Sequence, residues 1–172
     1  MPRQRQVYPT HEIAGLWWSE RQESARNPQG NFYFRNRIIY SYRDGFPIAR
    51  KVDSSLVLIN RNRYSMTTGR HINLVRYAIT PSRVTTIYVN YPGLQLSLDT
   101  LRELEDDFIY AVNRAKRARR YGDVYLADAR RYANHYAIVA EYLGLEQRLP
   151  IADDVKSTLL ALRLRGLNIN GN

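Results

Sequence analysis

The sequence contains no cysteine. Disulfide bonds and thiolate metal sites are therefore excluded. The sequence also has no apolar run near the ~20 residues that a membrane-spanning helix needs. Its first nine residues, MPRQRQVYP, lack the apolar stretch of a signal peptide. These absences lead us to expect an intracellular protein that resides in the cytoplasm.

Residues that serve metal and cofactor chemistry are scarce. The three histidines stand far apart, at positions 11, 71 and 135, and no spacing typical of a zinc or two-metal site occurs. The acidic pairs at 106–107 and 153–154 fall in early turns of predicted helices, where negative charge is favourable anyway. No glycine-rich phosphate loop is present. We expect no metal and no cofactor, and enzymatic activity is left uncertain, with the balance against it.

One cluster of hydroxyl groups surrounds an imidazole. Thr67 or Thr68 could cap a helix that carries Arg70 and His71, which would place the imidazole near a helix N-terminus, where anions bind. A histidine there can act as an acid or a base in phosphodiester chemistry. We favour the simpler interpretation, a capped helix with an ordinary polar face, because no carboxylate lies nearby in the sequence to orient the histidine.

Positive charge is abundant and unevenly distributed. The chain has 26 basic and 16 acidic residues, for a net charge of +10, and only three of the basic residues are lysines. Residues 1–92 carry a net charge of +9, whereas residues 93–172 carry +1. An excess of arginine in one part of a chain is typical of a surface that binds a polyanion. We therefore divide the chain into a basic region, 1–92, and a near-neutral region, 93–172.

The pattern of apolar residues changes between these two regions. The first shows short β-branched and aromatic runs separated by turn residues, and the second shows apolar residues at the 3–4 spacing of helices. We predict an α+β fold, in which an N-terminal helix and a basic antiparallel β-meander precede about three C-terminal helices. The predicted helices are 11–25, 69–78, 98–115, 123–143 and 152–165, and the predicted strands are 31–34, 38–42, 46–50, 56–59, 64–68 and 84–89.

Several short stretches between Ser24 and Ile79 carry a resemblance to known sequences. They are Ala25-Arg26, GNFYF from Gly30, IYSY from Ile39, FPIA from Phe46, Val57-Leu58, Tyr64-Ser65, Thr67-Thr68 and His71. In these stretches the chain resembles a family of small uncharacterised proteins encoded by bacteriophages and other mobile elements. The resemblance implies a viral or mobile-element origin and a host-cytoplasm setting, and it implies no particular activity.

The tripeptide Arg-Asn-Arg occurs twice, at 35–37 and at 61–63, each time between two predicted strands. Asparagine suits a turn, but a turn does not require flanking arginines. We predict that both turns lie at one edge of the sheet and present Arg35, Arg37, Arg61 and Arg63 together to a phosphate backbone.

Further residues complete the predicted binding surface. They are Arg43, Arg50, Lys51, Arg70, His71 and Tyr33. On alternate positions of a strand, Tyr33 and Arg35 face one side and Phe32 and Phe34 the other. A sheet face that mixes arginine with tyrosine is typical of single-stranded nucleic-acid binders. The sequence thus predicts a non-enzymatic nucleic-acid-binding protein, and it leaves open DNA or RNA and single or double strands.

Two alternatives belong to other classes of protein. A phage-encoded protein could inhibit or modulate a host protein, such as a defence or nucleic-acid-processing complex. In that case Trp17 or Trp18, which point about 100° apart on a helix, would supply an exposed contact. A structural component of a virion is the other alternative.

The basic run at 114–120 closes a helix that opens with acids, so we attribute it to the helix dipole.

Overall fold

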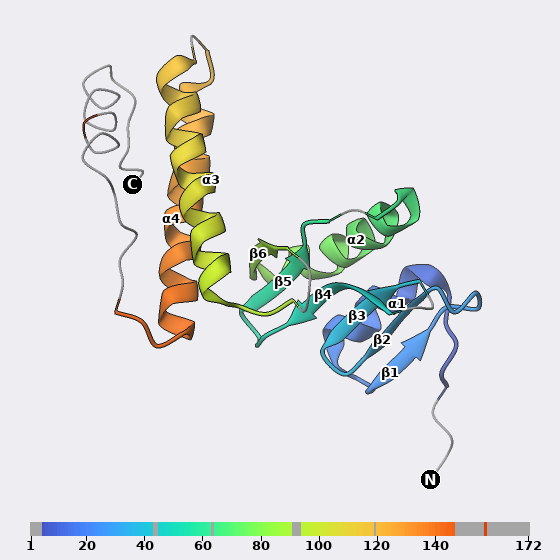
Figure 1. The fold of residues 1–172 in the computed structure, drawn as a ribbon. Coiled ribbons are helices and arrows are strands. Elements are labelled where there is room, and N and C mark those ends of the chain that lie inside the picture. Colours follow the sequence, from blue (N-terminus) through green and yellow to red (C-terminus); the bar gives the residue numbers. More distant parts are fainter. Residues whose placement is uncertain are drawn as a thin grey trace. The chain divides into compact units, whose positions relative to one another are not determined.

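The computed structural model describes residues 5–42, 45–62, 64–90, 94–118 and 120–146, together with Ser157. The chain forms two compact units, Met1–Gln95 and Leu96–Asn172. Figure 1 shows the helices and strands of each. The predicted α+β fold is confirmed, because a helix and a mostly antiparallel sheet come first and long helices follow.

The first unit contains a six-stranded sheet whose strands lie in chain order. Strands β1 to β5 pair antiparallel, and β6 pairs parallel to β5. Helix α2 makes the connection from β5 to β6 that a parallel pair requires. The elements are α1 (Thr10–Ser19), β1 (Ser24–Arg26), β2 (Phe32–Arg35), β3 (Ile38–Ser41), β4 (Phe46–Lys51), β5 (Leu56–Asn60), α2 (Met66–Ile79), the 3-10 turn η1 (Thr80–Ser82) and β6 (Thr85–Val89).

The core lies between one face of this sheet and the helices α1 and α2. Phe32, Phe34 and Ile39 alternate along β2 and β3 and are buried on this face. Trp17 of α1 and Val75 of α2 belong to the same cluster. The period of two in the strands therefore decides which side chains enter the core and which remain on the other face.

Two predicted elements of the first unit are wrong in part. The first helix ends at Ser19 instead of at residue 25, because Glu20 adopts a left-handed conformation (φ 51°), and Ser24–Arg26 then forms β1. Residues 66–68, predicted as part of a strand, begin α2. Ser65 caps this helix by accepting a hydrogen bond from the Thr68 N–H (3.2 Å), so the cap outweighs the β-propensity of the two threonines.

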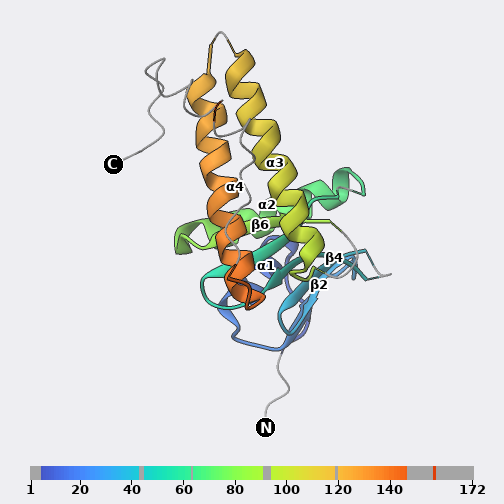
Figure 2. The same ribbon diagram turned by 60° about the vertical axis from the view of Figure 1, so that its left-hand side comes forward.

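The second unit is a helical hairpin of α3 (Leu98–Arg117) and α4 (Gly122–Tyr142), which run side by side in both ribbon views (Figures 1 and 2). Ser97 begins α3 with a capping box that Thr100 completes. Phe108 and Val112 of α3 pack with Ala129 of α4.

The predicted helix at 152–165 lies outside the described residues, apart from Ser157. In the part of the chain that is described, no helix is long and apolar enough to cross a bilayer.

The buried aromatic residues of β2 should dominate the stability of the first unit. Phe34 is 1% exposed, and its replacement by alanine should lower the free energy of unfolding by about 3–5 kcal/mol, since a cavity is left in the core. Urea denaturation followed by tryptophan fluorescence measures this, because both tryptophans lie in the first unit. Tyr77→Ala is the control. Tyr77 is 77% exposed, so a loss comparable to that of Phe34→Ala would contradict the assigned core.

Candidate nucleic-acid interface

The face of the sheet opposite α1 and α2 carries arginines and tyrosines in register. Arg26 pairs with Tyr33, which pairs in turn with Tyr40 across the next strand. Ile38 pairs with Arg35 on one side and with Arg50 on the other. Directly paired residues project from the same face. We call the surface formed by Arg26, Tyr33, Arg35, Tyr40 and Arg50 the open face.

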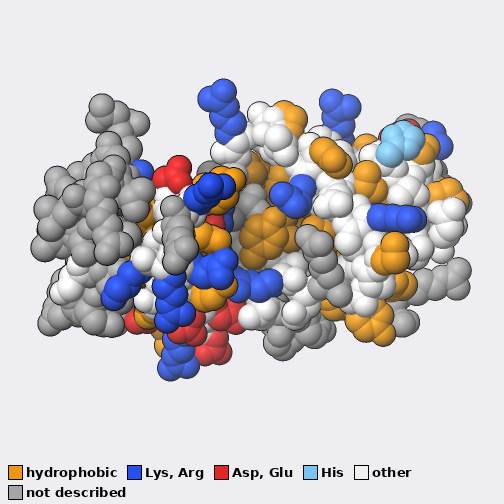
Figure 3. Space-filling model, turned by 90° about the horizontal axis from the view of Figure 1, so that it is seen from above, with side chains coloured by type: hydrophobic (Ala, Val, Ile, Leu, Met, Phe, Trp, Pro, Cys, Tyr) orange, Lys and Arg blue, Asp and Glu red, His pale blue; other side chains and the backbone are white. Residues whose placement is uncertain are grey.

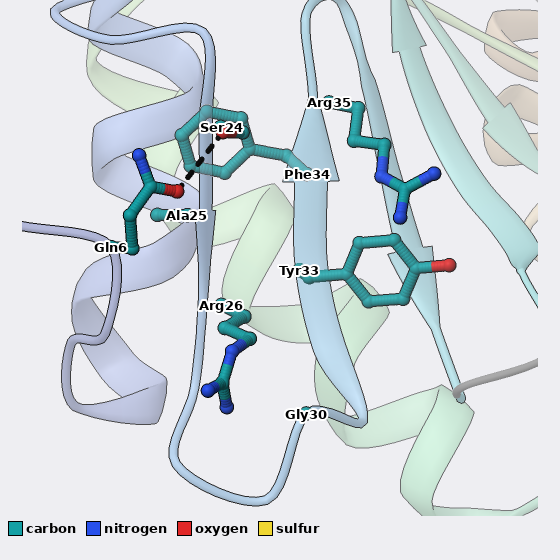
Figure 4. A pocket seen from close by; sticks show the side chains of 8 residues that line it. All are labelled: Gln6, Ser24, Ala25, Arg26, Gly30, Tyr33, Phe34 and Arg35. Carbon is teal, nitrogen blue, oxygen red and sulfur yellow. Dashed lines mark hydrogen bonds between the residues drawn. The ribbon is translucent and has the colours of Figure 1, made fainter.

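The two tyrosines at its centre are stacked. The ring centroids of Tyr33 and Tyr40 are 5.0 Å apart, with an interplanar angle of 14°. The guanidinium carbon of Arg35 lies 5.7 Å from the Tyr33 ring centroid. Figure 4 shows Arg35 and Tyr33 on the same side of β2, with Phe34 directed to the opposite side. The open face thus presents a pair of planar rings with a cation beside them.

A hollow of about 320 Å³ adjoins Tyr33 and Arg35 at the outer edge of the sheet (Figure 4). Its lining residues are Gln6, Ser24, Ala25, Arg26, Gly30, Tyr33, Phe34 and Arg35. The N-terminal segment forms one border, because the Arg26 N–H donates to the Gln6 carbonyl (2.9 Å) and the Tyr8 N–H donates to the Arg26 carbonyl (3.0 Å). This volume is at the lower end of the range for small-molecule pockets.

The two arginines of the first Arg-Asn-Arg turn have different surroundings. Asn36 takes a left-handed conformation (φ 49°) in the β2–β3 turn, as the sequence predicts. Arg35 extends onto the open face. Arg37 instead donates a hydrogen bond to the Val52 carbonyl (2.9 Å) and lies 3.9 Å from a carboxylate oxygen of Glu20. It ties the β2–β3 turn to its neighbours rather than joining Arg35.

The second Arg-Asn-Arg is not at the same edge, and this prediction is wrong. β2 and β5 run in opposite directions, so the residues that follow them leave the sheet at opposite ends. Arg61 is exposed beyond the end of β5, in the connection to α2 and not in a hairpin. Arg63 and Arg43 lie outside the described residues. The structure therefore does not bring Arg61 together with Arg35, as the prediction required.

Lys51, also predicted to bind nucleic acid, is buried. Its ammonium group lies 2.9 Å from a carboxylate oxygen of Glu20, donates to the Trp18 carbonyl (3.2 Å) and sits 4.5 Å from the Trp18 ring centroid. Lys51 projects toward the helices because Arg50, its neighbour on β4, projects onto the open face. Arg37 and Lys51, the two cations near Glu20, therefore both make their contacts within the first unit.

The tryptophans do not form the exposed contact that the host-protein alternative needs. Trp17 is buried in the core of the first unit. Trp18 is half-buried beneath Lys51, and its indole N–H donates to the Ser82 hydroxyl (2.8 Å). Both rings anchor α1 within its own unit.

His71 is a core residue, and Arg70 beside it is exposed. The imidazole Nδ1 shares a hydrogen bond with the Ser41 hydroxyl (2.8 Å), and the ring stacks on Phe32 at a centroid distance of 4.3 Å. Burial lowers the pKa of His71 to about 4, so the ring is neutral near pH 7. Ser41 is fully buried and cannot reach a substrate as a nucleophile. This pair stabilises the α2–β3 contact and does not support catalysis.

Metal binding likewise has no structural support within the described ranges. No group of three or more histidine, aspartate or glutamate side chains there could hold a metal ion.

Residues 19–87 match the model of DUF8033, a family of unknown function. No curated protein and no solved structure matches the chain. The range matched to DUF8033 includes β1 to β5 and α2, and so it contains every residue of the open face.

Two residues of the open face were absent from the predicted site. Arg26 was missed because residues 24–25 were assigned to the first helix. The turn sequence at 27–30, directly before a strand, was the signal for a hairpin that would have placed it. Tyr40 was missed because the pairing of β2 with β3 must be known before Tyr40 can be placed against Tyr33.

The buried His71 makes the stability of the first unit depend on pH. Below pH 6.5 the unfolded chain binds a proton at this residue that the folded chain binds only near pH 4. The free energy of unfolding should therefore fall as the pH drops from 6.5 to about 4, by up to roughly 3 kcal/mol. Denaturation at several pH values, followed by tryptophan fluorescence, measures this change.

The variant His71→Gln keeps a polar partner for Ser41 and should give a flatter pH profile. His11→Gln, at an exposed position, is the matched control and should keep the profile of the unaltered chain. All three proteins carry the same carboxylates. Identical profiles for the two variants would contradict a buried, neutral His71.

Proposed function

We propose that this chain is a non-enzymatic protein that binds single-stranded nucleic acid through the open face. The observation that carries the proposal is the stacked pair Tyr33–Tyr40 with Arg26, Arg35 and Arg50 around it. Rings for bases and guanidinium groups for phosphates, on one face of an antiparallel sheet, are the combination that single-strand binders use.

The tyrosine pair favours a single strand over a duplex. The faces of the bases are stacked on one another inside a duplex and are available to protein rings only when the strand is unpaired. Neighbouring strands of a sheet lie about 4.8 Å apart, so paired side chains on β1 to β4 form a continuous track across the strands. A single-stranded nucleic acid that lies along this track, from β1 toward β3, would contact Arg26, Tyr33 and Tyr40 in succession.

Charge supports the same ligand and predicts moderate affinity. The three arginines of the open face can each neutralise about one phosphate, which corresponds to a slope of roughly −2 for log K against log salt with a single strand. The net charge of +9 on residues 1–92 adds long-range attraction. Little sequence preference is expected, because rings and phosphate contacts read no base edges.

The host-protein alternative stays a prediction, as does a phage or mobile-element origin. Both follow from the resemblance noted in the sequence, and the exposed tryptophan on which the alternative relied is engaged within the first unit. If this protein binds no nucleic acid, the host-protein alternative is favoured.

Fluorescence anisotropy tests the proposal. It measures binding to labelled 20-nucleotide DNA and RNA strands of mixed sequence, and to the matching duplexes, across a salt series. Micromolar or tighter binding to single strands is expected, with weaker binding to duplexes. Tyr33→Ala and Tyr40→Ala should each weaken binding about tenfold, since stacking on one ring contributes ~1–3 kcal/mol per base. Tyr77→Ala, the control, changes an exposed tyrosine of α2.

Equal affinities for the three variants would remove the open face as the binding site. A preference for duplexes would contradict the role of the rings.

A further inference from the structure

The tip of the helical hairpin concentrates positive charge. α3 ends with Arg114, Lys116 and Arg117 in its last turn, and Arg120 stands two residues before α4. Asp123 is the one acidic residue between positions 108 and 127. Figure 3, which is seen from above, shows several Lys and Arg side chains over the helix pair, with Asp and Glu side chains beside them. We call Arg114, Lys116, Arg117, Arg120 and Tyr121 the hairpin tip.

The helix dipole does not account for this cluster. Cations at the end of α3 offset the negative pole of that helix, as the sequence indicates. In the hairpin, however, the positive pole of α4 lies beside this negative pole, so the two poles largely offset each other. The cations of the hairpin tip then repel one another and the start of α4. Within residues 94–118 and 120–146, no carboxylate forms an ion pair with Arg117 or Arg120. An external anion would relieve this repulsion.

An exposed aromatic ring accompanies the charge. Tyr121 is 71% exposed and is held in a left-handed conformation (φ 63°), which is unfavourable for an aromatic residue. Its side chain makes no capping hydrogen bond to α4. Nearby, the Arg114 guanidinium donates to the Tyr125 hydroxyl (2.8 Å) and lies 5.0 Å from that ring centroid. The ring of Tyr121 is thus presented to solvent, next in the chain to the exposed Arg120.

We propose that the hairpin tip is a second contact for single-stranded nucleic acid, in which Arg117 and Arg120 bind phosphates and Tyr121 stacks on a base. This inference rests on the proposed function in taking the same ligand, and it assigns a separate surface to it. Nucleic acid fits better than an acidic protein, because an exposed ring beside forked guanidinium groups matches the alternation of base and phosphate.

The test compares variants of the full chain that lose the same charge at different places. The double variant Arg117→Ala, Arg120→Ala alters the hairpin tip. The control, Arg102→Ala with Arg131→Ala, removes two exposed arginines elsewhere on α3 and α4. With a 30-nucleotide single strand, the tip variant should bind about tenfold more weakly than the control, and its salt slope should be shallower by about 1.4, for two phosphates. Circular dichroism checks that both variants keep their helices.

A second readout is independent of charge. Tyr121→Ala should weaken binding about fivefold or more, and a strand carrying bromouracil should form a photo-crosslink to the peptide that contains Tyr121.

The outcomes separate the two proposals. Equal loss in the tip variant and the control, with no crosslink at Tyr121, would overturn the second contact and leave the open face unaffected. Loss in the tip variant, without loss in Tyr33→Ala and Tyr40→Ala, would support the hairpin tip and overturn the open face. Absence of binding by the unaltered chain would overturn both.

Discussion

Helices α1 and α2 pack against the same face of the sheet, and the candidate site depends on the opposite face being uncovered along β2 and β3. At β5 both faces are buried. The parallel pairing of β6 with β5 requires a crossover connection, and α2 supplies it on the face that α1 already covers. Side chains along β2 and β3 therefore have two different environments. Phe32, Phe34 and Ile39 complete the core, and Tyr33, Arg35 and Tyr40 are left on the open face. A helix on the second face would bury these arginines at a large cost in free energy.

The sequence sufficed where structure is decided by neighbouring residues. The alternation in β2 and the start of α3 at Leu98 were predicted because a period of two and a 3–4 spacing of apolar residues are local signals. Pairing over longer distances was not predictable in this way. The tripeptides at 35–37 and 61–63 look alike, but an odd number of reversals separates β2 from β5 and puts them at opposite ends of the sheet. The strand β1 and the start of α2 were misassigned because tertiary pairing and the Ser65 cap outweighed local propensity.

Residue type alone could not separate structural cations from available ones. Arg35 and Arg37 are two positions apart, and Arg37 is held by Val52 and Glu20. Lys51 is adjacent to Arg50, and it is buried against Trp18 and Glu20. The position of Glu20 explains both cases, since the left-handed turn after α1 brings its carboxylate to the end of the sheet where Arg37 and Lys51 lie. Part of the positive charge of the first unit therefore stabilises the fold, and the net charge overstates what a ligand can use.

For the proposed binding of a single strand, this division of charge favours two modest contacts over one strong contact. The open face offers three arginines, and the hairpin tip adds Arg117 and Arg120 in a region that is close to neutral overall. Each set by itself neutralises few phosphates and would release a single strand readily at physiological salt. Two contacts on one chain act together, because binding at the first raises the effective concentration of the strand at the second. The same linkage makes the combined affinity steeply dependent on strand length: a strand too short to reach both surfaces gains only the affinity of one.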